Sequence, residues 1–170
     1  DSHTCTYGAL NAFATGVGST DAAAALKTGE LWFKVPATIK AVFNGTLRRG
    51  VYAKDLILYF IGKVKANGAN YKAIEFLGEA INELSIEDRM TICNMSIEMG
   101  AKAGLMLADK KTLTWLQNRT NRKYSSISPD PDAFYESTYE INAYDIEPQV
   151  AQPHQVDNVV PVKNIGNQKI

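Results

Sequence analysis

Hydrophobic and polar positions alternate with two different periods along this chain. Between residues 38 and 47, Ile39, Ala41 and Phe43 alternate with mostly polar neighbours, which predicts a strand. Between residues 53 and 65 the apolar residues recur at helical spacing, which predicts an amphipathic helix. Strands that alternate with helices predict the α/β class. Further strands are predicted at 71–76, 103–107 and 135–141, and further helices at 6–28 (two short ones, separated near 16–18), 78–84, 85–99 and 109–117.

The middle of the chain has the features of a self-contained unit. Residues 36–145 contain the predicted strands and most of the predicted helices, so we expect them to form one complete α/β domain. Prolines at positions 148, 153 and 161 predict irregular structure after residue 145. We expect residues 1–35 to end a preceding domain and residues 146–170 to begin a following one. Because the first residue is not Met, we expect an internal piece of a larger protein.

Composition narrows the possible partners. The 170 residues are 45% hydrophobic, and 18 basic side chains balance 18 acidic ones, which gives no indication of a nucleic-acid or anionic-membrane partner. The longest fully apolar run, 56–61, is far shorter than the roughly 18 residues of a membrane span. Cys5 and Cys93 are isolated from each other and from any CxxC motif, which favours a reduced, cytoplasmic setting.

The first three residues place a carboxylate, a hydroxyl and an imidazole together. Asp1, Ser2 and His3 are followed by a run of small residues that extends to Asp21. Small residues allow one backbone to approach another closely. The pattern therefore suggests a polar site on a tightly packed support.

A second polar group lies on the helix predicted at 85–99. Apolar residues surround this helix almost completely, whereas Thr91, Asn94 and Glu98 fall at i, i+3 and i+7 on one face. A glutamate on a buried helix is costly unless it is paired or liganded. A salt bridge to a neighbouring domain or a solvent-facing stripe would explain the same pattern.

The residues alone leave two further classes of function open. A metal-dependent hydrolase could use Asp1, His3, Glu98 and His154 as oxygen and nitrogen ligands. A non-catalytic interaction domain would fit the composition equally well. His154 follows Pro153, a position more typical of a loop histidine than of a ligand.

Two blocks of sequence resemble the aconitase superfamily. The first is Asp-Ser-His-Thr-Cys-Thr-Tyr-Gly-Ala-Leu-Asn-Ala-Phe-Ala-Thr-Gly-Val-Gly-Ser-Thr-Asp at 1–21, and the second is Thr-Ile-Cys-Asn-Met-Ser-Ile-Glu-Met-Gly-Ala at 91–101. Within the superfamily they are most similar to the large subunits of 3-isopropylmalate dehydratase and homoaconitase. The segments 31–36, 53–56 and 147–154 follow in family-like order, so the resemblance spans nearly the whole chain. It implies layered α/β domains of the aconitase type.

The resemblance implies a hydro-lyase with a [4Fe-4S] cluster. The family reaction removes water from a 2-hydroxy acid and adds it back the other way round, as from 2-isopropylmalate to 3-isopropylmalate in leucine biosynthesis. Homoaconitase and 2,3-dimethylmalate dehydratase are alternatives with the same fold and cofactor. By resemblance, Asp1 and His3 are catalytic beside the open iron and Glu98 bonds the leaving hydroxyl. Ser2 binds a substrate carboxylate, and Asn94 lies next to the cluster.

The resemblance also implies parts that this chain lacks. The cysteine ligands of the cluster lie outside it, and neither Cys5 nor Cys93 occupies a matching position, so no metal ligand is assigned here. The implied partners are a small subunit with the swivelling domain and a small hydroxy di- or tricarboxylic acid. We predict that the 170-residue chain alone is inactive.

Overall fold

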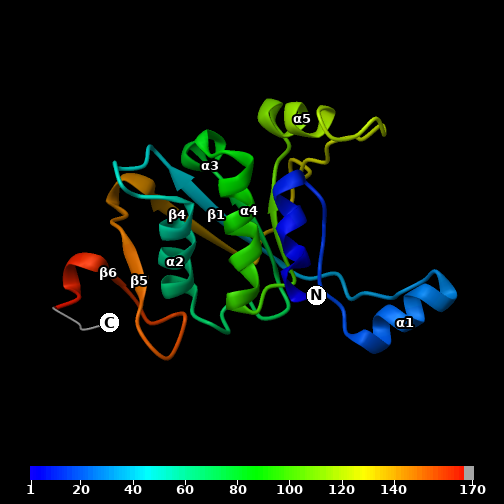
Figure 1. The fold of residues 1–170 in the computed structure, drawn as a ribbon, viewed down its shortest axis with the longest axis horizontal. Helices are drawn as coiled ribbons and strands as arrows, with labels where there is room; N and C mark the ends of the chain where they lie inside the picture. The colour runs from blue at the N-terminus through cyan, green and yellow to red at the C-terminus, as the bar shows by residue number, and fades with distance from the viewer. Residues whose placement is uncertain (167–170) are drawn as a thin grey trace.

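Four short strands form a parallel sheet at the centre of the molecule, in the order β3-β2-β1-β4 (Figure 1). The computed structural model describes residues 1–166. The predicted α/β class is confirmed, because helices connect the parallel strands. The strands are β1 (Thr38–Asn44), β2 (Ala73–Leu77), β3 (Ala103–Met106) and β4 (Ser137–Asn142).

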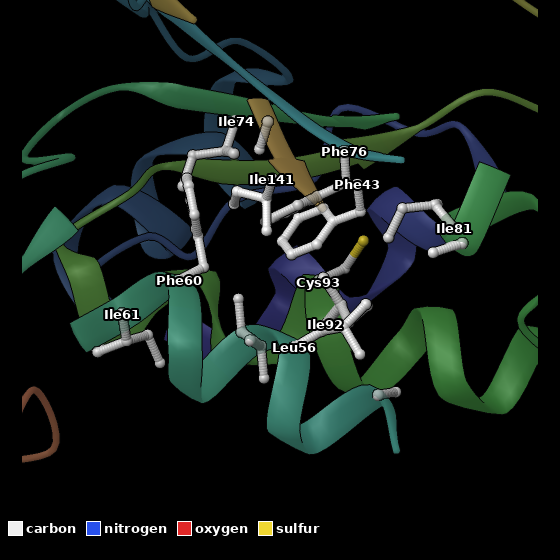
Figure 2. Packing of buried hydrophobic residues seen from close by; sticks show 14 of the residues in the cluster. Phe43, Leu56, Phe60, Ile61, Ile74, Phe76, Ile81, Ile92, Cys93 and Ile141 are labelled. Carbon is white, nitrogen blue, oxygen red and sulfur yellow. The ribbon is translucent and has the colours of Figure 1, made fainter. Parts of the chain in front are cut away.

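Two helices, α2 (Ala53–Val64) and α4 (Ile86–Asn94), cover one face of this sheet (Figure 1). The alternation predicted for β1 is confirmed, since Ile39, Ala41 and Phe43 are buried beneath the helices. Phe60 of α2 lies edge-on to the ring of Phe43, with the ring centroids 6.1 Å apart (Figure 2). Aromatic pairs prefer this edge-to-face arrangement. The hydrophobic core therefore lies between the sheet and these two helices.

The connection from β2 to β3 contains three helical pieces. Ser85 caps α4 by accepting a hydrogen bond from the N–H of Asp88. The predicted helix at 85–99 is α-helical only as far as Asn94 and then tightens into a 3-10 helix, a common way to satisfy the last carbonyl groups. The strand predicted from 71 begins two residues later because Tyr71 has a positive φ of 56°. The other two pieces are α3 (Glu79–Glu83) and η2 (Met95–Met99).

The N-terminal part consists of the two predicted short helices. The first, η1 (Ser2–Leu10), is a 3-10 helix that packs against α4 and β3 and buries Cys5 and Ala9. It begins at Ser2, earlier than predicted. The second, α1 (Ser19–Thr28), has no buried residue and extends away from the rest of the described chain (Figure 1). These two helices therefore have very different environments.

The C-terminal part is less irregular than predicted. Gln149–Ala151 (β5) and Val159–Pro161 (β6) form an antiparallel pair that packs on α2. The prediction of irregular structure was wrong there, because short edge strands tolerate prolines at their ends. The remaining elements are α5 (Lys110–Gln117), η3 (Ala143–Asp145) and η4 (Val162–Asn164).

No helix within residues 1–166 is both long enough and apolar enough to cross a membrane. The predicted division at residues 35 and 145 stays a prediction. Residues 167–170 of the last predicted piece lie outside the described part.

Candidate functional site

An imidazole and a carboxylate from distant parts of the sequence lie side by side on an open face. His3 Nε2 of η1 is 4.0 Å from Glu98 Oε1 of η2, and the two side chains are 47% and 38% exposed. Both elements pack on β3 and on each other, which fixes where these two residues stand. The structure thus brings together two of the residues proposed as catalytic from the sequence.

Asp1 starts the helix that carries His3. Its Oδ1 accepts a hydrogen bond of 2.9 Å from the backbone N–H of His3, and Thr4 Oγ1 accepts one of 3.2 Å from the Asp1 nitrogen. This reciprocal arrangement is a capping box, which fixes the first turn of η1. The cap uses one of the two carboxylate oxygens of Asp1, so the residue has a structural role besides any chemical one.

Ser2 lies on the opposite side of the imidazole from Glu98. Its Oγ is 3.4 Å from Nδ1 of His3, and both side chains are exposed. The Ser2 hydroxyl can either donate to Nδ1 or accept from it, so this contact is compatible with both neutral tautomers of the imidazole. The nitrogen that faces Glu98 is Nε2, and it can donate toward the carboxylate when it carries the ring proton.

Asn94 is linked to η1 through a residue that the sequence analysis missed. Asn94 Nδ2 donates to Thr6 Oγ1 at 2.9 Å, and Thr6 Oγ1 donates to the backbone carbonyl of His3 at 2.7 Å. Thr6 follows His3 by three residues, which is one turn of a 3-10 helix, and that spacing was the available signal. Thr91, by contrast, donates to the carbonyl of Glu87 in its own helix and lies outside this network.

His154 is not brought to this face. It lies in the loop between β5 and β6, and that strand pair packs on α2 at the other end of the molecule (Figure 1). Among residues 1–166, no group of three or more His, Cys, Asp or Glu side chains is arranged to hold a metal ion. The described residues therefore do not form the four-ligand hydrolase site considered from the sequence.

The two cysteines are both buried beneath the site. Neither has an exposed side chain, and Cys5 Sγ donates to the backbone carbonyl of Asn94 at 3.4 Å. Burial raises the pKa of both thiols, so neither is disposed to form the thiolate that ligates iron. Cys93 packs into the hydrophobic core (Figure 2). These thiols do not fit the role of cluster ligands, whereas His3 and Glu98 fit the role of hydrogen-bonding neighbours to a bound group.

The sequence profile of the aconitase family (aconitate hydratase) matches residues 1–170. The chain belongs to the aconitase family. The probable methanogen homoaconitase large subunit of Methanosarcina mazei is 57% identical over 165 residues, which are 97% of this chain and 42% of that protein. The 3-isopropylmalate dehydratase large subunit of Halothermothrix orenii is 56% identical over 170 residues, all of this chain and 40% of that protein.

A third relative matches the chain over its whole length. The 3-isopropylmalate dehydratase large subunit 1 of Pyrococcus furiosus is 54% identical over 170 residues, again all of this chain and 40% of that protein. The chain thus spans about two fifths of the length of these curated relatives. The recognition of the family from the blocks at 1–21 and 91–101 is confirmed.

Proposed function

We propose that this chain is part of the large subunit of a hydro-lyase that dehydrates and rehydrates a 2-hydroxy acid. The observation that carries the proposal is the pairing of His3 with Glu98, 4.0 Å apart on an exposed face. The two residues come from the two family-like blocks and are 95 positions apart in the sequence. Membership of the aconitase family, and relatives with dehydratase names, support the same reaction class.

The spacing of this pair suits an oxygen atom held between the two side chains. At 4.0 Å, His3 Nε2 and Glu98 Oε1 are too far apart for a good direct hydrogen bond. A hydroxyl or water oxygen beside them can accept from Nε2–H and donate to Oε1 at the same time. The pair can therefore orient a departing or arriving water and exchange its proton, which is the requirement of a hydro-lyase.

Asp1 and Ser2 extend the site along the same turn. The second carboxylate oxygen of Asp1 is free of the cap and can accept a hydrogen bond from the departing or arriving water, while Oδ1 keeps the turn capped. The Ser2 hydroxyl is exposed and can donate to a carboxylate of the substrate. In this proposal Asp1, His3 and Glu98 handle protons, and Ser2 orients the hydroxy acid.

The full-length protein is proposed to contain a [4Fe-4S] cluster whose cysteine ligands lie outside this chain. When bound, the cluster supplies a Lewis acid that makes the substrate hydroxyl a better leaving group. Asn94 is proposed to lie beside it. The buried Cys5 and Cys93 support the assignment of the ligands to other parts of the protein.

The proposed substrate is 2-isopropylmalate, with homocitrate (the hydroxy acid that a homoaconitase dehydrates) or 2,3-dimethylmalate as alternatives. The near-equal identities to a homoaconitase and a dehydratase large subunit, 57% and 56%, do not separate these substrates. The words "large subunit" in the relatives' names support a small subunit as partner. We propose that 1–35, 36–145 and 146–170 belong to three successive domains of the whole protein.

The test uses the full-length protein with its small subunit under anaerobic conditions. Dehydration of each of the three candidate substrates is followed for the parent, His3→Gln and Glu98→Gln. Both substitutions should lower kcat by roughly 10²–10⁴, the usual contribution of a general acid or base. Glu83→Gln, which changes an exposed glutamate at the end of α3, should leave kcat unchanged. A Glu98→Gln enzyme with parental kcat would contradict the proposal.

A further inference from the structure

We propose that Thr6 is a positioning residue that sets the His3–Glu98 geometry and fixes the amide of Asn94. This inference rests on the proposed function, because it assigns Thr6 to the hydro-lyase site. The two hydrogen bonds of the Thr6 hydroxyl go to the His3 carbonyl and the Asn94 amide, not to His3 Nε2 or Glu98. It acts through the backbone of one site residue and the side chain of another.

The hydroxyl of Thr6 makes two hydrogen bonds to site residues, one as a donor and one as an acceptor. Its single proton is donated to the His3 carbonyl at 2.7 Å, so its oxygen can only accept from Asn94. The atom of Asn94 that faces Thr6 must therefore be Nδ2, at 2.9 Å, and not Oδ1. Thr6 thereby determines which way round the Asn94 amide is held, with the amide oxygen on the side away from the Thr6 hydroxyl.

The hydrogen-bonded chain from His3 through Thr6 to Asn94 connects the two parts of the structure that carry His3 and Glu98. His3 lies in the first turn of η1. Asn94 ends α4 and immediately precedes η2, the element that carries Glu98. A hydrogen-bonded link from His3 through Thr6 to Asn94 therefore joins the start of one 3-10 helix to the start of the other. Rotation of either helix would break it.

A second contact reinforces the same junction. Cys5, the residue before Thr6, donates from Sγ to the backbone carbonyl of Asn94 at 3.4 Å. Asn94 is thus held through both its side chain and its backbone by consecutive residues of η1. Thr6 and Asn94 are both partly buried, so water competes less effectively for these groups than at the exposed His3.

The test removes the hydroxyl while keeping the shape of the side chain. In the full-length enzyme with its small subunit, Thr6→Val should lower kcat about tenfold and change KM by less than about twofold, because the substrate contacts remain. Thr6→Ser keeps the hydroxyl and should retain kcat within about threefold of the parent. Thr91→Val is the matched control, since that hydroxyl bonds only within α4, and it should have parental kcat.

A double-mutant cycle with Asn94→Ala separates this role from a purely structural one. If Thr6 acts through Asn94, Thr6→Val should cost much less kcat in the Asn94→Ala enzyme than in the parent. Independent, multiplicative effects would overturn the inference, as would a Thr6→Val enzyme that unfolds at a lower temperature but has parental kcat. Glu98→Gln is measured beside these variants. If Glu98→Gln lowers kcat while Thr6→Val has parental kcat, only this inference fails; if Glu98→Gln has no effect, the proposed function fails.

Discussion

Gly8 of η1 lies so close to Gly104 of β3 that a β-carbon on Gly8 would be 1.6 Å from the Gly104 carbonyl oxygen. A β-carbon on Gly104 would in turn be 2.2 Å from the hydroxyl of Ser96 in η2. The two 3-10 helices therefore sit on β3 at distances that only glycine permits. This close stacking holds His3 and Glu98 on neighbouring elements at the observed separation.

Gly8→Ala should disrupt the site and destabilise the protein together. The added methyl meets backbone atoms, which cannot move aside as a flexible side chain can, so η1 must shift away from β3. We expect a loss of about 2–3 kcal/mol, as for other overpacked sites, and a lower kcat in the full-length enzyme. The measurements are thermal unfolding and steady-state turnover. Gly18→Ala is the control, because a β-carbon there would have its nearest neighbouring atom 3.5 Å away and the φ of Gly18 is −69°. Equal effects of the two substitutions would contradict the close-packing argument.

Arg89→Met should destabilise the junction between α4 and α5. Arg89 is only 1% exposed, and its guanidinium donates to Asp109, to Thr112 Oγ1 at 3.3 Å and to the Asn82 carbonyl at 3.0 Å. Removing it takes the cation away from the partly buried Asp109 carboxylate and removes three hydrogen bonds, which costs about 3 kcal/mol, toward the lower end for buried pairs because Asp109 is partly exposed. Thermal unfolding of the full-length protein measures the loss. Arg122→Met, at an exposed position, should leave the unfolding temperature unchanged.

The same pair predicts how stability responds to acid. Burial acts to raise the pKa of Asp109, but the hydrogen bond and charge of Arg89 and the N–H of Thr112 outweigh it and hold the pKa at about 2, below the ordinary 3.8. The unfolded chain therefore binds more protons than the folded one between these values. The contribution of Asp109 is fully present above pH 3.8 and is lost as the pH falls through about 2.

An Asp109→Asn variant tests this pH dependence. Its unfolding temperature should be below that of the parent at pH 6, and the difference should shrink as the pH falls toward 2. Asp132→Asn, in an exposed loop, provides the comparison. A difference between Asp109→Asn and the parent that stays constant from pH 6 to pH 2 would show that the carboxylate makes no such contribution.

Periodicity predicted the elements of the sheet and the core better than it predicted the site. Alternation located β1 because every second residue packs beneath the helices. The helical face assigned to Thr91, Asn94 and Glu98 assumed one continuous α-helix, whereas the chain tightens to three residues per turn after Asn94. The pairing of Glu98 with His3 followed from the family resemblance of two blocks, not from the spacing within either block.

Long-range contacts and very short strands were beyond what the pattern could show. The bond between Thr6 and Asn94 spans 88 positions, and nothing in the local sequence of either residue specifies it. The strands β5 and β6 have three residues each, too few to show a period of two. That His154 lies far from His3 follows only from the packing of the β5–β6 pair on α2, which the sequence pattern does not show.

Cys5 and Cys93 should be inert in the folded protein and dispensable for holding iron. Both side chains are fully buried, and burial raises the pKa of each thiol, so iodoacetamide at pH 8 should label neither until guanidinium unfolds the chain. Peptide mass spectrometry distinguishes these two cysteines from others in the full-length protein. Cys5→Ala and Cys93→Ala should each keep the parental iron and sulfide content after anaerobic reconstitution, with Ala replacing a small buried thiol at little cost in packing. Loss of iron from either variant, in protein that remains folded by circular dichroism, would assign that thiol to the cluster and contradict the proposed placement of the ligands outside this chain.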